Sequence, residues 1–174
     1  MDNRQKERQQ RGDDFQNEIR HSWHLIPNCW RMAIESGKGQ GQSSGTRPAD
    51  TITLLQNVNL LVELKRTNAV SFKLNMLRPN QLEGLIAFDK VIRRNVGIVF
   101  VSFLNEERGI DSAYSFRLID GLKFMKTRGR LHIKLEEFTG GPNVVPSLRL
   151  PQLPGPNRLY DLSEVNDYYS GYRK

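Results

Sequence analysis

The hydrophobic pattern of the chain switches between the period of a helix and that of a strand. Phe15, Ile19 and Trp23 recur at every fourth position and predict a helix that begins at Asp13 or Asp14. The same criteria predict, in order, a short strand at 29–34, strands at 51–55 and 58–62, a helix from 79 to about 94, and strands at 96–104 and around 114–118. This order predicts an α/β fold, in which helices pack against a mixed central sheet.

Two of these strands form a predicted hairpin whose register follows from its turn. If Gln56-Asn57 is the two-residue turn, Asp50 faces Glu63 across the two strands. Directly opposed residues share a face of the sheet, with β-carbons about 4.5 to 5.5 Å apart. Lys65 lies on that face too, because the side chains of a strand alternate. We therefore expect two carboxylates and one ammonium group to converge.

This cluster has the chemistry of a metal site. Two carboxylates at such a spacing repel each other unless a cation lies between them, and hard oxygen ligands select Mg²⁺ or Mn²⁺. For Glu63-Leu64-Lys65 taken alone, a solvated hairpin edge with an ordinary Glu–Lys pair is the more common explanation. Here the tripeptide follows the apolar run Leu60 to Val62, which should be buried. A buried strand that ends in charges favours the metal site.

Several short motifs occur in the order of a known nuclease signature. They are Arg47-Pro48-Ala49-Asp50, Glu63-Leu64-Lys65, Ser71-Phe72, Gln81 and the apolar strand at 97–103. In this order the sequence resembles the PD-(D/E)XK nuclease superfamily, in the form found in RecU-type Holliday junction resolvases, from about residue 12 to residue 138. The resemblance implies a restriction-endonuclease-like core at 12–139, which contains a Gly/Ser-rich loop at 36–45.

The resemblance also implies roles for individual residues in a Mg²⁺- or Mn²⁺-dependent endonuclease. Asp50, Glu63 and the backbone carbonyl of Leu64 would bind the metal. Lys65 would orient the attacking water or stabilise the developing charge, and Gln81 would help to place water or backbone. Spacing alone would make Gln81 an exposed residue at the start of a helix. The family further implies that the substrate is a four-way DNA junction and that the protein is a two-fold homodimer.

The sequence departs from the family pattern at two places. The family often carries a metal-binding glutamate on its first helix, and that position holds Gln16 here, so Glu18 is the candidate substitute as an outer metal ligand. The stretch 36–45 is shorter than the stalk of RecU-type resolvases, and its composition is that of a flexible linker. It is not a phosphate-binding loop of the Walker A type, because Gly39 follows Lys38 where Ser or Thr is required.

The composition indicates the kind of partner and the cell compartment of the protein. The 174 residues include 26 Lys and Arg against 19 Asp and Glu, which gives a net charge of +7 and favours polyanionic partners. A single cysteine, Cys29, excludes an internal disulfide and indicates a reducing compartment. The sequence contains neither an apolar run of about 20 residues nor a signal-peptide core, so we predict a cytoplasmic protein without a membrane span.

Polar and basic segments flank or follow the predicted core. Residues 1–11 are almost wholly polar and predict a flexible N-terminal segment, while the prolines and tyrosines of 140–174 predict an extended tail that stacks on bases or packs against a partner subunit. A cluster of cations near the end of the core is explained equally well by phosphate contacts or by a solvated face. The expected DNA contacts are Lys38, Arg47, Lys123, Lys126, Arg128, Arg130 and Lys134.

Two other functions remain open from the sequence. One is a restriction or repair endonuclease of the same fold with another DNA target. The other is a non-catalytic DNA-binding protein, for which Gln16 in place of a glutamate is the hint.

Overall fold

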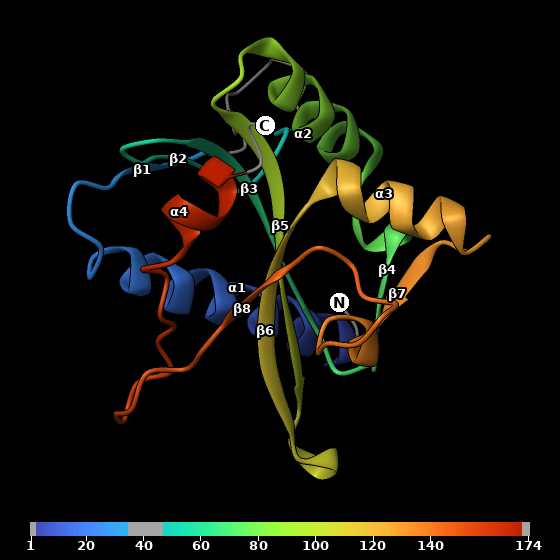
Figure 1. The fold of residues 1–174 in the computed structure, drawn as a ribbon. Helices are drawn as coiled ribbons and strands as arrows, with labels where there is room; N and C mark the ends of the chain where they lie inside the picture. The colour runs from blue at the N-terminus through green and yellow to red at the C-terminus, as the bar shows by residue number, and fades with distance from the viewer. Residues whose placement is uncertain (1–2, 35–46, 172–174) are drawn as a thin grey trace, which may run out of the picture.

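A six-stranded sheet forms the centre of the computed structural model, which describes residues 3–34 and 47–171 (Figure 1). The strand order is β1-β2-β3-β5-β6-β8; β3 and β5 are parallel, and every other neighbouring pair is antiparallel. The strands are β1 (Trp30–Ala33), β2 (Thr51–Leu54), β3 (Asn59–Thr67), β5 (Asn95–Asn105), β6 (Ile110–Arg117) and β8 (Leu148–Leu150). The predicted α/β architecture with a mixed central sheet is confirmed.

Helices cover both faces of the sheet (Figure 1). The α-helices are α1 (Asn3–Trp23), α2 (Pro79–Val91), α3 (Leu118–Thr127) and α4 (Val165–Ser170). A small antiparallel sheet pairs β4 (Ser71–Lys73) with β7 (His132–Lys134). Three short 3-10 helices complete the described elements: η1 (Leu74–Met76), η2 (Glu106–Arg108) and η3 (Leu135–Glu137).

Each face of the sheet has its own hydrophobic cluster. Leu60, Val62 and Leu64 of β3 belong to the cluster that contains α1 residues, whereas Leu61 belongs to the cluster that contains α2 residues such as Leu85. We call the two sides of the sheet the α1 face and the α2 face. Because side chains alternate along a strand, the side chains of successive β3 residues point to opposite faces.

The predicted hairpin has the predicted register. Thr51 pairs with Val62 and Leu54 pairs with Asn59, around a turn closed by the 2.9 Å bond from the Leu55 N–H to the Val58 carbonyl. Asp50 lies one residue before β2, where its N–H bonds back to the Val62 carbonyl at 3.0 Å. The chain therefore bends at Asp50 and does not extend the ladder to Glu63.

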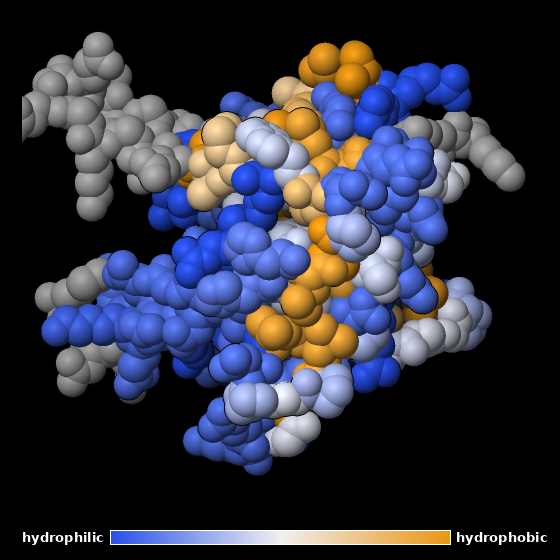
Figure 2. Space-filling model, turned by 90° about the vertical axis from the view of Figure 1, so that its left-hand side faces the viewer, coloured by the Kyte–Doolittle hydropathy of each residue, from blue (hydrophilic) through white to orange (hydrophobic). Residues whose placement is uncertain are grey.

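Strand β1, which pairs with β2 at the edge of the sheet, carries exposed apolar side chains. Trp30 and Met32 of the edge strand β1 are about half exposed, and Leu54 of β2 is opposite Trp30. Figure 2 shows the side of the molecule that lies at the left in Figure 1, where apolar side chains form a band between polar areas. No helix in the described residues is long and apolar enough to span a membrane.

The first helix begins earlier than predicted. It begins at Asn3, about ten residues before Asp13 or Asp14. The sequence from Gln5 to Arg11 consists of Gln, Lys, Glu and Arg, which are good helix formers, so the helix continues without an apolar stripe. Periodicity could not reveal these turns because no apolar residue precedes Phe15 in this helix. Flexibility of 1–11 stays a prediction.

The sequence patterns did not predict helix α3. Leu118 was predicted as the end of a strand, but β6 ends at Arg117 and Leu118 begins α3. The buried positions Leu118, Gly121 and Met125 have helical spacing. At Gly121 an added β-carbon would lie 2.6 Å from the Phe116 ring, so the helix passes close to β6 at this point.

The prediction of an extended C-terminal tail was wrong. β8 pairs with β6, and residues from Leu150 onward enter the cluster on the α1 face. Tyr160 and Tyr169 are 2% and 0% exposed, respectively, so neither can stack on a DNA base in this structure. Prolines concealed this outcome because they interrupt the periodicity by which an element is recognised.

Candidate metal site

The three residues of the Glu63-Leu64-Lys65 motif lie at the centre of the candidate site. Glu63 and Lys65 are on the α2 face, and the Lys65 Nζ lies 2.6 Å from the Glu63 Oε1. The Gln81 Nε2 donates to the same Oε1 at 2.6 Å. The Glu63 Oε2 is buried and has no hydrogen-bond partner. One oxygen of this carboxylate is therefore held by two donors, and the other is unpaired.

Burial and a second acid raise the pKa of the Glu63 carboxyl group above its ordinary value. Desolvation and the nearby charge of Asp50 raise the pKa of Glu63 from 4.5 to about 7, against the opposing effect of Lys65. The Asp50 carboxylate accepts the N–H of Leu64, the residue after Glu63, so the two acids are neighbours in space. A cation between them would remove the repulsion, so the pair is suited to bind one.

Asp50 is held in place by backbone and by a cation. Its Oδ2 accepts the Leu64 N–H at 2.8 Å, and its Oδ1 lies 2.8 Å from the Arg47 Nη2. The N–H and carbonyl of one strand residue point to the same side of the strand. The Leu64 carbonyl therefore also points toward the side where Asp50 lies, beyond the end of β2.

Gln81 joins the site to the start of α2. Its Oε1 accepts the Arg78 N–H at 2.9 Å, as the N3 residue of a capping box does, and lies 3.4 Å from the Lys65 Nζ. Its Nε2 bonds Glu63, so both ends of the amide are used. Gln81 is 3% exposed. The structure therefore brings Gln81 into the site, where it holds Glu63 and Lys65.

The donor set fits a hard divalent cation. The unpaired Glu63 Oε2, the Asp50 carboxylate and the Leu64 carbonyl are all oxygen donors, which Mg²⁺ and Mn²⁺ prefer over softer ligands. No group of three or more His, Cys, Asp or Glu side chains with metal-binding geometry occurs within the described residues. Mg²⁺ commonly uses only one or two carboxylates and retains several waters, so two carboxylates are sufficient.

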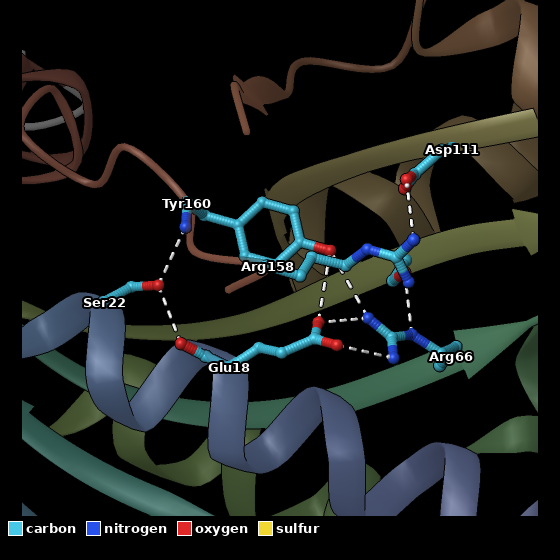
Figure 3. Close-up of polar contacts among 7 residues, drawn as sticks. Glu18, Ser22, Arg66, Asp111, Arg158 and Tyr160 are labelled. Atoms are coloured by element: carbon cyan, nitrogen blue, oxygen red, sulfur yellow. Dashed lines mark hydrogen bonds and ion pairs between the residues drawn. The ribbon is translucent and has the colours of Figure 1, made fainter. Parts of the chain in front are cut away.

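Glu18, the predicted outer metal ligand, lies on the other face of the sheet. Its carboxylate is paired with the Arg66 guanidinium through both oxygens, with 3.1 Å between the Arg66 Nη1 and the Glu18 Oε1. The Tyr160 hydroxyl donates to the Glu18 Oε2 at 3.4 Å, and the Ser22 hydroxyl donates to the Glu18 carbonyl (Figure 3). Arg66 follows Lys65 and points to the α1 face. The structure thus does not bring Glu18 to Asp50 and Glu63.

Gln16 is the α1 residue that approaches the site. Its Nε2 lies 3.5 Å from the Asp50 Oδ1, at the limit of a hydrogen bond. The position that holds a glutamate in the resembling family therefore points toward Asp50 here, but it supplies an amide donor in place of a carboxylate. The first helix adds no negative charge to the pair of acids at this contact.

The predicted DNA contacts have different surroundings. Lys123, Lys126, Arg128 and Lys134 are exposed on or after α3, whereas Arg130 is half-buried and paired with Glu137. Lys134 and Lys123 each have a carboxylate neighbour, at 3.2 and 3.5 Å. Lys38 lies outside the described residues. DNA binding by these side chains stays a prediction.

Sequence reasoning did not identify Arg47 as a partner of Asp50, nor Asn80 and Gly84 as contacts of the segment that precedes β2. The spacing of Arg47 and Asp50, three residues apart, was a usable signal for the ion pair. The contacts of Asn80 and Gly84 join segments more than 30 residues apart, and no local pattern reports them.

Comparison with known proteins finds no match in sequence but finds solved structures of similar fold. No protein-family model matches the chain. No curated protein matches it in sequence. Among solved structures, the chain is similar to Archaeoglobus fulgidus Hjc, a Holliday junction resolvase from an archaeal hyperthermophile, at 13% identity. The match covers 72% of this chain and 89% of that chain, with a TM-score of 0.48.

Proposed function

We propose that this protein is a Mg²⁺-dependent endonuclease that hydrolyses phosphodiester bonds in branched DNA. The observation that carries the proposal is the Glu63 Oε2, a buried and unpaired carboxylate oxygen beside a second carboxylate and a lysine. Native proteins rarely leave a buried polar atom without a partner, and a bound ion is one explanation of such an atom. A divalent cation supplies that partner.

The residues have separate roles in this proposal. Asp50, Glu63 and the Leu64 carbonyl hold Mg²⁺, which lowers the pKa of a bound water and offsets charge on the scissile phosphate. The Asp50 carboxylate is oriented for this by the Leu64 N–H, and Glu63 by the Gln81 amide.

Lys65 is the residue that faces the substrate in this proposal. Its side chain is 19% exposed, so the ammonium is partly open to solvent while it contacts Glu63. An ammonium at this place orients a water through hydrogen bonds, or stabilises the negative charge that develops on the phosphate. Arg47, whose side chain is 30% exposed, supplies a second cation at Asp50 for the DNA backbone.

The branched substrate and the assembly come from the resemblance of the motif order to RecU-type resolvases. Resolution of a four-way junction requires two symmetrical nicks, so we propose a two-fold homodimer. A sedimentation measurement at micromolar concentration tests it, and a monomer would contradict paired nicking.

The decisive experiment is a cleavage assay on a synthetic four-way junction, a flap and a linear duplex, with and without Mg²⁺. We expect Mg²⁺-dependent cleavage that favours the junction and is lost in Asp50→Asn. Equal cleavage of the three substrates would indicate a restriction or repair endonuclease. Equal loss of DNA binding and cleavage in Asp50→Asn would show that Asp50 is structural.

A non-catalytic DNA-binding protein is the second candidate, and the Gln16 amide beside Asp50 is the observation that favours it. A protein of this kind has no need to bind a cation between Asp50 and Glu63. Isothermal titration with Mn²⁺ separates the two candidates. Binding that disappears in Glu63→Gln supports the nuclease, and absence of binding supports the alternative.

A further inference from the structure

Helix α2 contacts the segment that carries Asp50 at two points. The Asn80 side-chain amide donates to the Arg47 carbonyl. One turn further along the helix, Gly84 meets Pro48: a β-carbon added to Gly84 would lie 2.4 Å from the Pro48 Cβ and 3.1 Å from the Pro48 Cα and carbonyl oxygen. The backbones of the helix and the segment are therefore in direct contact.

This contact explains a glycine in the interior of a helix. Glycine is less favourable there than any residue except proline, because it loses the most backbone freedom. Gly12 of α1 offers a comparison, since nothing lies within 4 Å of its added β-carbon. Of these two helical glycines, only Gly84 lies where a side chain would clash, and the nearest atoms belong to Pro48, two residues before Asp50.

The same helix holds the other carboxylate. Gln81 lies between Asn80 and Gly84 in sequence and bonds the Glu63 Oε1 at 2.6 Å. The helix is itself pressed against β5, because a β-carbon added to Gly97 would lie 2.2 Å from the Leu85 carbonyl oxygen. The helix thus touches the segment before Asp50, touches Glu63 directly, and has little freedom to move away from the sheet.

We propose that Gly84 and Asn80 are positioning residues that fix the Asp50 carboxylate relative to Glu63. They touch neither the cation nor the substrate and act through Pro48 and the Arg47 backbone. The inference rests on the proposed function insofar as the fixed arrangement serves a divalent cation. Residues that orient metal ligands from behind typically change metal affinity about 10- to 100-fold when replaced.

The test compares Gly84→Ala with Gly12→Ala, the same change in a helix without a close neighbour. In the metal-free protein the Leu64 amide reports the position of Asp50, because its N–H donates to the Asp50 Oδ2. We expect hydrogen exchange at Leu64 to accelerate about tenfold or more in Gly84→Ala, as expected for a lost bond to a charged acceptor. Exchange at Phe100, in the centre of β5, should change little.

Mn²⁺ titration of the same proteins gives the second readout. Gly84→Ala should weaken Mn²⁺ binding about 10- to 100-fold. Gly12→Ala should leave it unchanged and raise the melting temperature by about 2 to 4 °C, because alanine favours the helix. Adding Pro48→Gly to Gly84→Ala removes the nearest clashing atom and should restore part of both effects. If Gly84→Ala does not fold, Asn80→Ala should show the same two effects at smaller size.

The results separate this inference from the proposed function. Faster Leu64 exchange in a protein whose wild type neither binds Mn²⁺ nor cleaves DNA would support the positioning role and reject the nuclease. Unchanged Leu64 exchange and unchanged Mn²⁺ affinity in Gly84→Ala would overturn the positioning role. Equal acceleration at Leu64 and Phe100 would also overturn it, because the glycine would then serve only global stability.

Discussion

Glu63 and Glu18 form two carboxylate–cation pairs on opposite faces of one strand. Glu63 pairs with Lys65 on the α2 face, and Glu18 pairs with Arg66 on the α1 face. Both glutamate side chains are largely buried, at 1% and 15% exposure. The two pairs differ in how their oxygens are used. Each oxygen of Glu18 meets a donor, whereas the donors to Glu63 converge on Oε1 and leave Oε2 unpaired.

The difference distinguishes a structural pair from a site. The Arg66 guanidinium bonds Glu18, the Ser102 hydroxyl and the Tyr160 hydroxyl, and so ties α1 and the C-terminal segment to the sheet (Figure 3). A buried pair with all its groups satisfied needs no ligand. The Glu63 pair is incomplete by the same criterion, and the cation that we propose would complete it. An unpaired oxygen alone is not sufficient, because the Asp120 Oδ2 is also buried and unpaired; at Glu63 it coincides with the nearby charge of Asp50.

The largest expected effect is on catalysis at the incomplete pair. In the proposed nuclease Glu63→Gln removes a charged metal ligand, and we expect cleavage of a four-way junction to fall by more than about 1000-fold, since a metal supplies several kcal/mol of transition-state stabilisation. Single-turnover cleavage in Mg²⁺ measures it. Binding of the junction should be retained or strengthened because repulsion of phosphate decreases. Glu18→Gln is the control and should cleave within a few-fold of the wild type. Similar losses in both variants would remove the distinction between the pairs.

The second effect is on stability, and here the Glu18 variant should lose more than the Glu63 variant. Glu18→Ala leaves the Arg66 guanidinium, only 2% exposed, without its carboxylate. Removing one partner of a buried pair costs about 3 to 5 kcal/mol, and the partial exposure of Glu18 places the cost near the lower value. Urea unfolding at pH 7 measures it. Glu63→Gln should leave the stability of the metal-free protein equal or higher, because a buried acid is replaced by a neutral side chain. A larger loss in Glu63→Gln than in Glu18→Ala would contradict the comparison.

Local patterns predicted the register of the hairpin well and its surroundings poorly. The hairpin register followed from a two-residue turn and from the period of two, both of which are local. Glu63 and Lys65 therefore lie where the pattern indicated. Glu18 did not, because the side of a helix that meets a sheet is set by packing: Phe15, Ile19 and Trp23 are all buried, and Glu18 is carried toward Arg66.

The C-terminal residues show the limit of sequence patterns most clearly. Tyr160 and Tyr169 are separated from their contacts by many residues: the Tyr160 N–H bonds the Ser22 hydroxyl, and the Tyr169 hydroxyl bonds the Ser115 hydroxyl. Proline-rich sequence between these tyrosines and the core gave no periodic signal. Their burial depends on long-range contacts, which neither propensity nor composition reports.

The next effect is a pH dependence of stability that comes from the Glu63 carboxyl group. The pKa of Glu63 is raised to about 7 from 4.5, so between these values the folded metal-free protein retains a proton that the unfolded chain releases. Its contribution to stability is therefore complete below about pH 4.5 and is lost as the pH rises through about 7. Each unit of pKa corresponds to about 1.36 kcal/mol, so the loss amounts to roughly 3 kcal/mol. Urea unfolding from pH 5 to pH 8 measures it. Glu63→Gln should flatten this dependence, and an unchanged slope in that variant would assign it to other groups.

The smallest expected effect concerns the face on which DNA lies. If the α2 face is the DNA side, exposed cations there contact phosphates and those far along α1 do not. Lys126→Gln, on α3, should reduce the slope of log affinity against log salt by about one, because one fewer phosphate is neutralised. Lys6→Gln, which changes a lysine that is also exposed but lies on α1, should leave the slope unchanged. Fluorescence anisotropy with a labelled junction, in the Glu63→Gln background to prevent cleavage, measures both. A reduced slope for Lys6→Gln alone would place DNA along α1, on the side where the fully paired Glu18 lies.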